Sequence, residues 1–213
     1  MAITKIKALG VTANTITASQ IANDTITNTQ INTSAAIAAT KLGTLASANM
    51  PAGSVLQAIT STTDTQQSLS ASTTWADITG LTVNITPKAT SNIINVTGTI
   101  YIGSGSNPNG GIRCYRSETS GGGNAAAVGA TASGDSNFIR GDAFWNSDDF
   151  GGLNYTLFAI PFFLKDTAPS TNQLTYKLQW ASSSAVTQYI NYPSNGTNYG
   201  RGTHSITVME IKA

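Results

Sequence analysis

The one histidine of the sequence, His204, directly precedes Ser205. A serine and a histidine can act as nucleophile and general base, but only when their side chains face each other. The surrounding residues predict a strand, in which neighbouring side chains point to opposite faces. We therefore expect His204 to be a structural or exposed residue and not a catalytic base.

Cys114 is the only cysteine, and it stands in the segment Ile-Arg-Cys-Tyr. A single cysteine forms no intrachain disulfide. A zinc site needs about four nitrogen, sulfur or oxygen ligands, so one cysteine and one histidine argue against such a site. We expect Cys114 to be a buried strand residue, and we expect no metal, no cofactor and no catalytic residue in the chain.

Three carboxylates, Asp142, Asp148 and Asp149, lie close together in the sequence. Paired carboxylates can hydrolyse glycosides or bind Ca²⁺. Their spacing does not match an EF-hand loop, and a solvated loop is the simplest interpretation. A glycan depolymerase remains the least favoured alternative.

Aromatic and polar residues alternate near the end of the chain. Exposed aromatic rings with asparagine, arginine and backbone amides can stack on sugars and donate hydrogen bonds to them. One hypothesis is therefore that these loops contact host surface glycan. The other is that the tyrosines pack over the fold or at a subunit interface. The candidate glycan contacts are Tyr189, Tyr192, Tyr199 and Arg201 in residues 189–201, and Trp145 in another loop.

The composition narrows the classes of fold and partner. Charged residues make up 10% of the chain, against about 25% in an average soluble domain. The net charge of +1 argues against nucleic-acid binding, which needs a basic patch. Few helix-favouring charged residues and many Thr, Val and Ile favour strands, so we expect an all-β protein. No apolar stretch is long enough to span a membrane, and no secretory signal is evident.

An apolar repeat of five residues marks the first part of the chain, where residues 8–40 contain one charge, Asp24. A period of five fits neither a helix nor a flat strand, and one such residue in five cannot form a core. Either three copies wind around one axis, or the segment docks in a groove of another protein; a flexible linker is the remaining alternative. The repeat comprises Val11, Ile16, Ile21, Ile26 and Ile31, continued after a one-residue slip by Ile37 and Leu42.

The repeat arm, residues 1–48, is followed by a strand-rich segment, residues 49–213. Apolar and polar residues alternate at 81–85, 94–102 and 174–180, which is typical of half-buried antiparallel strands. Residues 75–78, with Trp75 and Ile78, form a separate short run. Weaker runs bring the expected total to about eight to ten strands. The sequence therefore predicts an extended arm followed by an antiparallel jelly-roll-like β-sandwich.

Two runs, at residues 157–164 and 206–211, are apolar on both faces. One face of a sandwich strand belongs to the core, so the second face must be covered by something else. A subunit interface explains both runs. Pro161 predicts that its strand lies at a sheet edge or contains a bulge.

Four segments carry a family resemblance: residues 34–42 (Ser-Ala-Ala-Ile-Ala-Ala-Thr-Lys-Leu), 50–57 (Met-Pro-Ala-Gly-Ser-Val-Leu-Gln), 175–179 and 205–211. Together they resemble fibre and virion structural proteins of tailed bacteriophages, particularly marine cyanophage-like ones. The resemblance implies a homotrimer located on the virion, an N-terminal arm anchored to other virion proteins, and an outward head similar to C1q or tumour necrosis factor heads. It implies no enzymatic activity, and it leaves open whether the protein sits on the capsid or the tail. The alternative is a lectin-like receptor-binding tip.

Overall fold

The structure is a computed structural model of residues 1–213. It describes residues 19, 21–22, 26–27, 29–32, 34–35, 46–70, 74–103, 110–119, 124–128, 143–145, 157–182, 187–193 and 200–213. The chain divides into two compact units, Met1–Leu45 and Ala46–Ala213. The second unit, called the head below, begins with the short 3-10 helix η4 (Ser47–Asn49), which contains the expected boundary between residues 48 and 49. No helix in the described ranges is long and apolar enough to cross a membrane.

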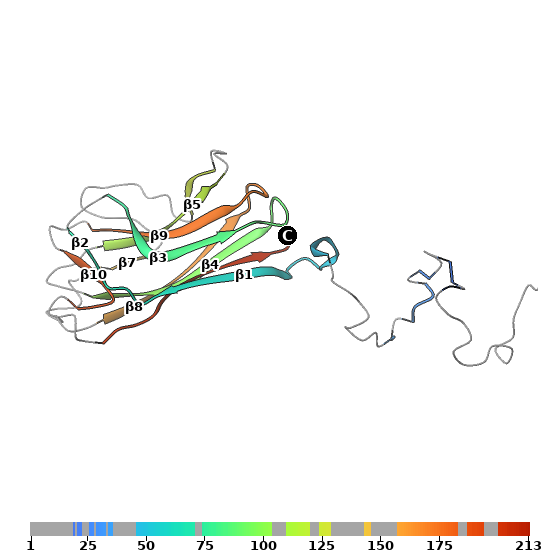
Figure 1. Ribbon diagram of the computed structural model, residues 1–213, viewed down its shortest axis with the longest axis horizontal. Coiled ribbons are helices and arrows are strands. Elements are labelled where there is room, and N and C mark those ends of the chain that lie inside the picture. Colours follow the sequence, from blue (N-terminus) through green and yellow to red (C-terminus); the bar gives the residue numbers. More distant parts are fainter. Residues whose placement is uncertain are drawn as a thin grey trace, which may run out of the picture. The chain divides into compact units, whose positions relative to one another are not determined.

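The head consists of two antiparallel sheets, which Figure 1 shows as stacked layers. The six-stranded sheet has the order β1-β11-β4-β10-β2, and β8 pairs with the other edge of β4. Its strands are β1 (Val55–Thr63), β2 (Gln67–Leu69), β4 (Ile93–Gly103), β8 (Leu157–Thr167), β10 (Gln188–Ile190) and β11 (His204–Ile211). The five-stranded sheet has the order β3-β9-β5-β6, and β7 also pairs with β5. Its strands are β3 (Ala76–Ile85), β5 (Gly110–Glu118), β6 (Ala126–Val128), β7 (Ala143–Trp145) and β9 (Leu174–Ser182).

The pairing is nested along the chain. The first long strand pairs with the last, β1 with β11, and inside that pair β3 pairs with β9, β4 with β8 and β5 with β7. The inner pairs alternate between the sheets, because β3-β9 and β5-β7 belong to the five-stranded sheet and β4-β8 belongs to the six-stranded sheet. This alternation of nested antiparallel pairs is the winding of a jelly roll. The prediction of an all-β, jelly-roll-like sandwich is therefore confirmed.

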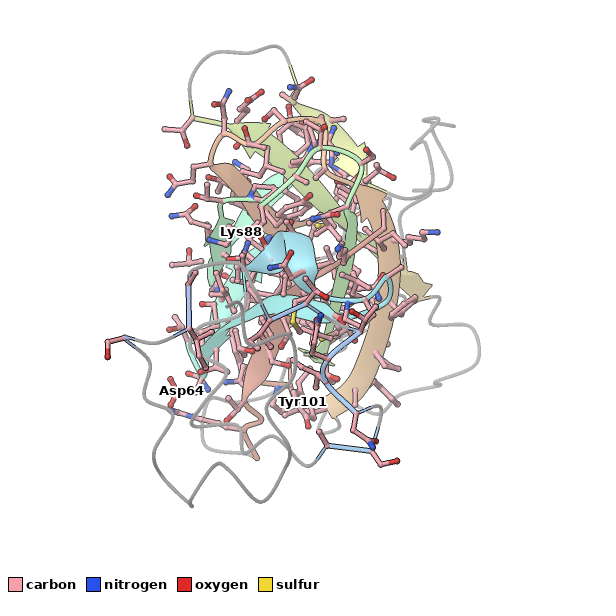
Figure 2. The ribbon with its side chains drawn as sticks, turned by 90° about the vertical axis from the view of Figure 1, so that its right-hand side faces the viewer. Asp64, Lys88 and Tyr101 are labelled. Atoms are coloured by element: carbon pink, nitrogen blue, oxygen red, sulfur yellow. The ribbon has the colours of Figure 1, made fainter. Side chains whose placement is uncertain are left out.

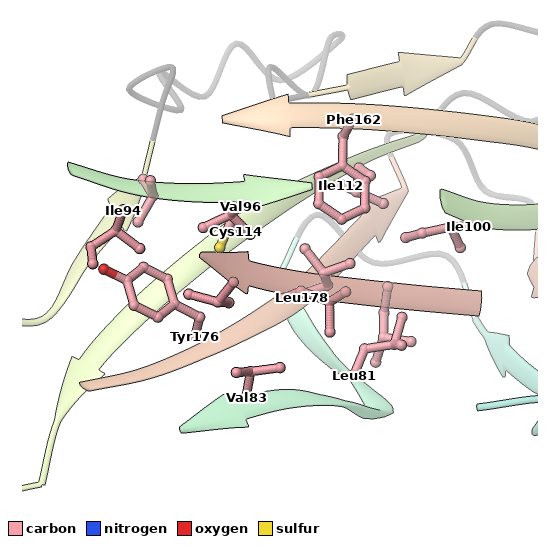
Figure 3. Close-up of a cluster of buried hydrophobic side chains, with 14 of the residues drawn as sticks. Leu81, Val83, Ile94, Val96, Ile100, Ile112, Cys114, Phe162, Tyr176 and Leu178 are labelled. Carbon is pink, nitrogen blue, oxygen red and sulfur yellow. The ribbon is translucent and has the colours of Figure 1, made fainter. Parts of the chain in front are cut away.

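The core lies between the sheets and is built by the predicted alternation. The side chains of Ile94, Val96, Ile100 and Ile102 point inward from β4, and all are buried. From the facing sheet, β9 contributes Leu174, Tyr176, Leu178 and Trp180. Figure 3 shows Phe162 of β8 pointing into the same cluster. Burying each large side chain contributes about 1.5–3 kcal/mol.

The strand β3 departs from the sequence prediction, which separated residues 75–78 from 81–85. The structure joins them into one strand with a register irregularity between Asp77 and Thr82. The irregularity lets Ile78 and Leu81, three residues apart, both enter the core. Gly80 accommodates it with a φ of +86°, and a Cβ at this position would lie 2.8 Å from Thr63 Cβ.

The two runs that are apolar on both faces lie in the same sheet, on either side of β4. Their inner faces supply Phe162, Ile206 and Val208 to the core. The inner face of β11 is not wholly apolar, because His204 and Glu210 are also fully buried. Within the described strands β8 pairs only with β4, so Pro161 lies on an edge strand as predicted. An edge is where proline is tolerated, because it has no N–H for a ladder hydrogen bond.

Candidate functional site

The outer face of the β8-β4-β11-β1 sheet has almost no charge. Lys165 carries the only charge among its described outward positions, and Phe163 is 64% exposed. Threonines fill much of the rest, and the hydroxyls of Thr60 and Thr207 lie 2.8 Å apart across β1 and β11. We call this surface the low-charge face. Its outward residues are Val55, Ala58, Thr60, Thr62, Ile93, Asn95, Thr97, Thr99, Tyr101, Leu157, Ala159, Pro161, Phe163, Lys165, Thr167, Ser205, Thr207, Met209 and Ile211.

The outer face of the β3-β9-β5 sheet is the opposite in character, and we call it the polar face. Asp77, Arg113 and Lys177 carry charges there, and Lys177 Nζ lies 2.6 Å from Asp77 Oδ2. Further along, Thr175 donates a hydrogen bond to Asn84 (2.8 Å). Such a surface is readily solvated by water. The low-charge face is suited to burial against protein, since its described polar side chains are hydroxyls, one amide (Asn95) and one lysine.

Glu210 organises the end of the head at which Val55 pairs with Ile211, called the base below. Its carboxylate is fully buried. It accepts hydrogen bonds from Gln57 Nε2 (2.6 Å), from the Lys88 backbone N–H (2.7 Å) and from Asn92 Nδ2 (2.6 Å); Lys88 is labelled in Figure 2. Burying a carboxylate costs free energy unless its oxygens accept hydrogen bonds, and these three donors offset that cost. Sequence reasoning missed this residue, although its two-residue spacing from Val208 places it on the core face.

Lys212 fixes the first residues of the head at the base. Its ammonium donates hydrogen bonds to the carbonyls of Ala48 (2.7 Å) and Met50. Its backbone is bonded to the turn before β1, through Gly53 N to Lys212 O (2.8 Å) and Lys212 N to Ser54 O (2.9 Å). The segment that follows the repeat arm therefore begins at the base.

His204 lies at the other end of the strands, the distal end, where it pairs with Thr63. Its ring is fully buried, and Nδ1 accepts a hydrogen bond from the Tyr101 backbone N–H (3.0 Å). Among the described residues Nε2 has no partner. Burial lowers the pKa of His204 to about 4, against a smaller opposing effect of Asp64. Ser205 points to the low-charge face, so the two side chains do not form a nucleophile–base pair.

Two of the candidate glycan contacts are together at the distal end. The rings of Tyr189 and Tyr192 are 5.0 Å apart in an edge-to-face arrangement, and both are half-buried. Between them Asn191, with a φ of 65°, is fully buried. Its side-chain oxygen accepts a hydrogen bond from Gly202 N (2.7 Å), and its backbone N–H donates one to Tyr101 O (3.0 Å). The edge-to-face contact of the Tyr189 and Tyr192 rings favours the hypothesis that these tyrosines pack within the fold.

The remaining candidates are placed only in part. Arg201 is exposed near the distal end. Trp145 belongs to β7, but its side chain and the whole of Tyr199 lie outside the described residues, as do Asp142, Asp148 and Asp149. The buried position predicted for Cys114 is confirmed. Within the described ranges no group of three His, Cys, Asp or Glu side chains could hold a metal ion.

The repeat arm is described at three of its apolar positions. Ile21, Ile26 and Ile31 are 40%, 56% and 39% exposed. Val11, Ile16, Ile37 and Leu42 lie outside the described residues. Side chains of this size gain free energy when they are buried, so the three isoleucines are available to a partner.

Comparison with known proteins identifies no family. No protein-family model matches the chain, and no curated protein matches it. Among solved structures, one described as the structure of infectious bursal disease virus, Gx strain, is similar over 74% of this chain at 14% sequence identity, with a TM-score of 0.35. The match spans 37% of that viral chain, and a likeness at this level establishes no common function.

Proposed function

We propose that this chain is a non-enzymatic virion structural protein of a tailed bacteriophage, which forms a homotrimeric fibre or spike. The observation that carries the proposal is the contrast between the two outer faces of the head. The polar face is charged and hydrogen-bonded. The described part of the low-charge face presents Phe163, Met209 and Ile211 with a single lysine. The resemblance of the arm and of the closing strands to phage virion proteins supports the same function.

Self-association explains the low-charge face. Cyclic symmetry lets every copy cover the exposed face of another, so no copy leaves its apolar residues in water. Both edges of the face are uncharged strands, β1 and the Pro161-containing part of β8. We propose that three copies meet through this face, as the resemblance implies.

The two ends of the head suit different tasks. The base receives the chain from the arm, and there Lys212 and Glu210 hold the first residues and the neighbouring turns. The distal end carries Tyr189, Tyr192 and Arg201. We propose that the arm attaches to other virion proteins, by burying its regularly spaced isoleucines, and that the distal end faces outward.

Particles assembled with altered copies of the chain test the arm. Changing Ile21, Ile26 and Ile31 together to Asn removes the apolar contacts and should leave the chain absent from purified particles, as measured by mass spectrometry. A control with Thr27→Asn and Thr29→Asn should be incorporated normally. Full incorporation of the isoleucine variant would overturn the proposed attachment, and absence of the unaltered chain from particles would overturn the virion assignment.

A lectin-like distal tip is the second candidate function. The observation that favours it is that Arg201 is exposed and Tyr192 is partly exposed, and that their chain neighbours Gly202 and Asn191 are joined by a hydrogen bond. Host binding by the Tyr192→Ala protein, compared with the unaltered protein, tests it, since equal binding would leave this tip without a role in recognition.

A further inference from the structure

An aromatic and polar cluster covers part of the polar face, on the sheet opposite the one that carries the low-charge face and Tyr189. We call it the Trp75 cluster. It consists of Trp75, Asp77, Arg113, Tyr115, Lys177 and Gln179, which come from β3, the residue before it, β5 and β9.

Strand register brings the cluster together in two rows. Asp77 of β3 lies opposite Gln179 of β9, which lies opposite Arg113 of β5. In the next row Lys177 lies opposite Tyr115. Side chains at such cross-strand positions are about 4.5–5.5 Å apart at Cβ, close enough for one small ligand to touch both rows.

Hydrogen bonds fix the polar members before any ligand arrives. Gln179 accepts a hydrogen bond from Arg113 Nε (2.8 Å) and donates one to Asp77 Oδ1 (2.6 Å). Lys177 donates to Asp77 Oδ2 (2.6 Å). Burial opposes ionisation of Asp77, but the bonds from Lys177 and Gln179 outweigh it and lower the pKa of this carboxyl. A ligand therefore meets an ionised acceptor whose orientation needs no further ordering.

The aromatic members are held by cations. Arg113 Cζ lies 4.6 Å from the ring centre of Trp75 and 5.4 Å from that of Tyr115. Lys177 Nζ lies 5.7 Å from the Tyr115 ring. Cation–π contacts of this length are attractive, and they tie both rings to the sheet next to the polar row.

The cluster also has capacity for a ligand. The Asp77 side chain is 52% exposed and that of Lys177 is 26% exposed. A carboxylate offers about four acceptor positions and an ammonium three donors. The bonds described above occupy only some of them, so both groups can bind hydroxyls from the solvent side.

We infer that the Trp75 cluster is a saccharide-binding site. Sugars combine an apolar ring face, which stacks on aromatic side chains, with hydroxyls that both donate and accept hydrogen bonds. The two adjacent rows offer the ring of Tyr115, an acceptor in Asp77 and a donor in Lys177, and the ring of Trp75 adjoins them through Arg113. Nucleic acid fits less well, because Asp77 would repel phosphate and the chain has a net charge of only +1. The inference does not depend on the proposed virion role.

Binding to an array of neutral and acidic oligosaccharides tests the inference with the full chain. The unaltered protein should retain at least one saccharide, and calorimetric titration then gives its Kd. Asp77→Asn and Tyr115→Ala should each weaken that Kd by about tenfold or more, as expected for a lost charged hydrogen bond or stacking ring. Tyr189→Ala, at the distal end, is the matched control and should leave the Kd unchanged.

Thermal unfolding of each protein separates binding from folding. Asp77 is largely exposed, so its variant should melt cooperatively near the unaltered protein, even if Tyr115→Ala does not. No retained saccharide, or an unchanged Kd in a folded Asp77→Asn protein, would overturn the inference. Loss of binding in Tyr189→Ala with full binding in Asp77→Asn would also overturn it, and would place the sugar at the distal tip.

Discussion

Acidification should destabilise the head through His204. The ring is buried and neutral, its Nδ1 accepts the Tyr101 N–H, and its pKa is lowered from 6.5 to about 4. Protonation would place an N–H on Nδ1 facing the N–H of Tyr101 and would put a charge in the core. The unfolded chain therefore binds this proton more readily than the folded one, so stability falls as pH drops from 6.5 toward 4.

The size of the effect follows from the two pKa values. With 6.5 in the unfolded and about 4 in the folded chain, the free energy of unfolding should decrease by about 2 kcal/mol between pH 7 and pH 5. This window lies above the pKa values of ordinary carboxyl groups, about 3.9 for Asp and 4.3 for Glu. Titration of Asp and Glu therefore adds little to the decrease.

Urea unfolding at pH 7, 6 and 5 measures the decrease. His204→Asn is the matched variant, since its side-chain oxygen can accept the Tyr101 N–H but does not titrate. It should be less stable at pH 7, because a smaller side chain leaves a cavity, yet nearly independent of pH in this range. The reasoning is refuted if the unaltered protein is equally stable at pH 7 and 5, or if both proteins show the same slope.

Three further predictions concern stability and are measured by urea unfolding at neutral pH. Glu210→Ala leaves three hydrogen-bond donors at the base without their acceptor and should cost about 2 kcal/mol or more; a loss below about 0.5 kcal/mol would show that the network contributes little. Leu178→Ala opens a cavity in the core, where the leucine is 1% exposed, and should cost about 2–5 kcal/mol, whereas Ile59→Ala at the exposed edge should cost clearly less. Gly80→Ala forces a side chain into a left-handed conformation against Thr63 and should cost at least about 1 kcal/mol; an unchanged or increased stability would contradict the described turn.

The two-residue alternation of apolar and polar residues predicted the strands whose core-facing positions are all apolar. Residues 94–102 and 174–180 follow the two-residue period, and the structure buries the predicted faces. The irregular strand β3 was divided in two, because a register irregularity puts Ile78 and Leu81 on the same face despite their odd spacing. Periodicity in one sequence does not distinguish such an irregularity from a strand boundary.

The burial of Glu210 was not predicted, and His204 was expected to be either structural or exposed. Glu210 and His204 occupy core positions of β11, and their burial depends on partners contributed by distant segments. The donors to Glu210 come from Gln57, Lys88 and Asn92. Their two-residue spacing from Ile206 and Val208 points both side chains to the core, but nothing in the neighbouring sequence shows that a hydrogen-bond partner will be present there.

The candidate sites also differ in how far the sequence could predict them. Tyr189 and Tyr192 are close in sequence, so their grouping was predicted, and the structure brings them to 5.0 Å. The Trp75 cluster was missed because its members belong to three strands whose order and register are properties of the whole sandwich. The low-charge face was anticipated in part, since the two-sided apolar runs indicated a covered surface, but their meeting in one sheet depends on the nested pairing.

The solution mass of the purified protein tests the proposed assembly through the low-charge face most directly. Multi-angle light scattering should give three times the 22.0 kDa of one chain. Phe163→Asp puts a charge where three copies are proposed to meet, and it should give the mass of one folded chain. Asn84→Asp, which adds the same charge to the polar face, should remain a trimer. A monomeric unaltered protein, or a Phe163→Asp protein that remains trimeric, would contradict assembly through this face.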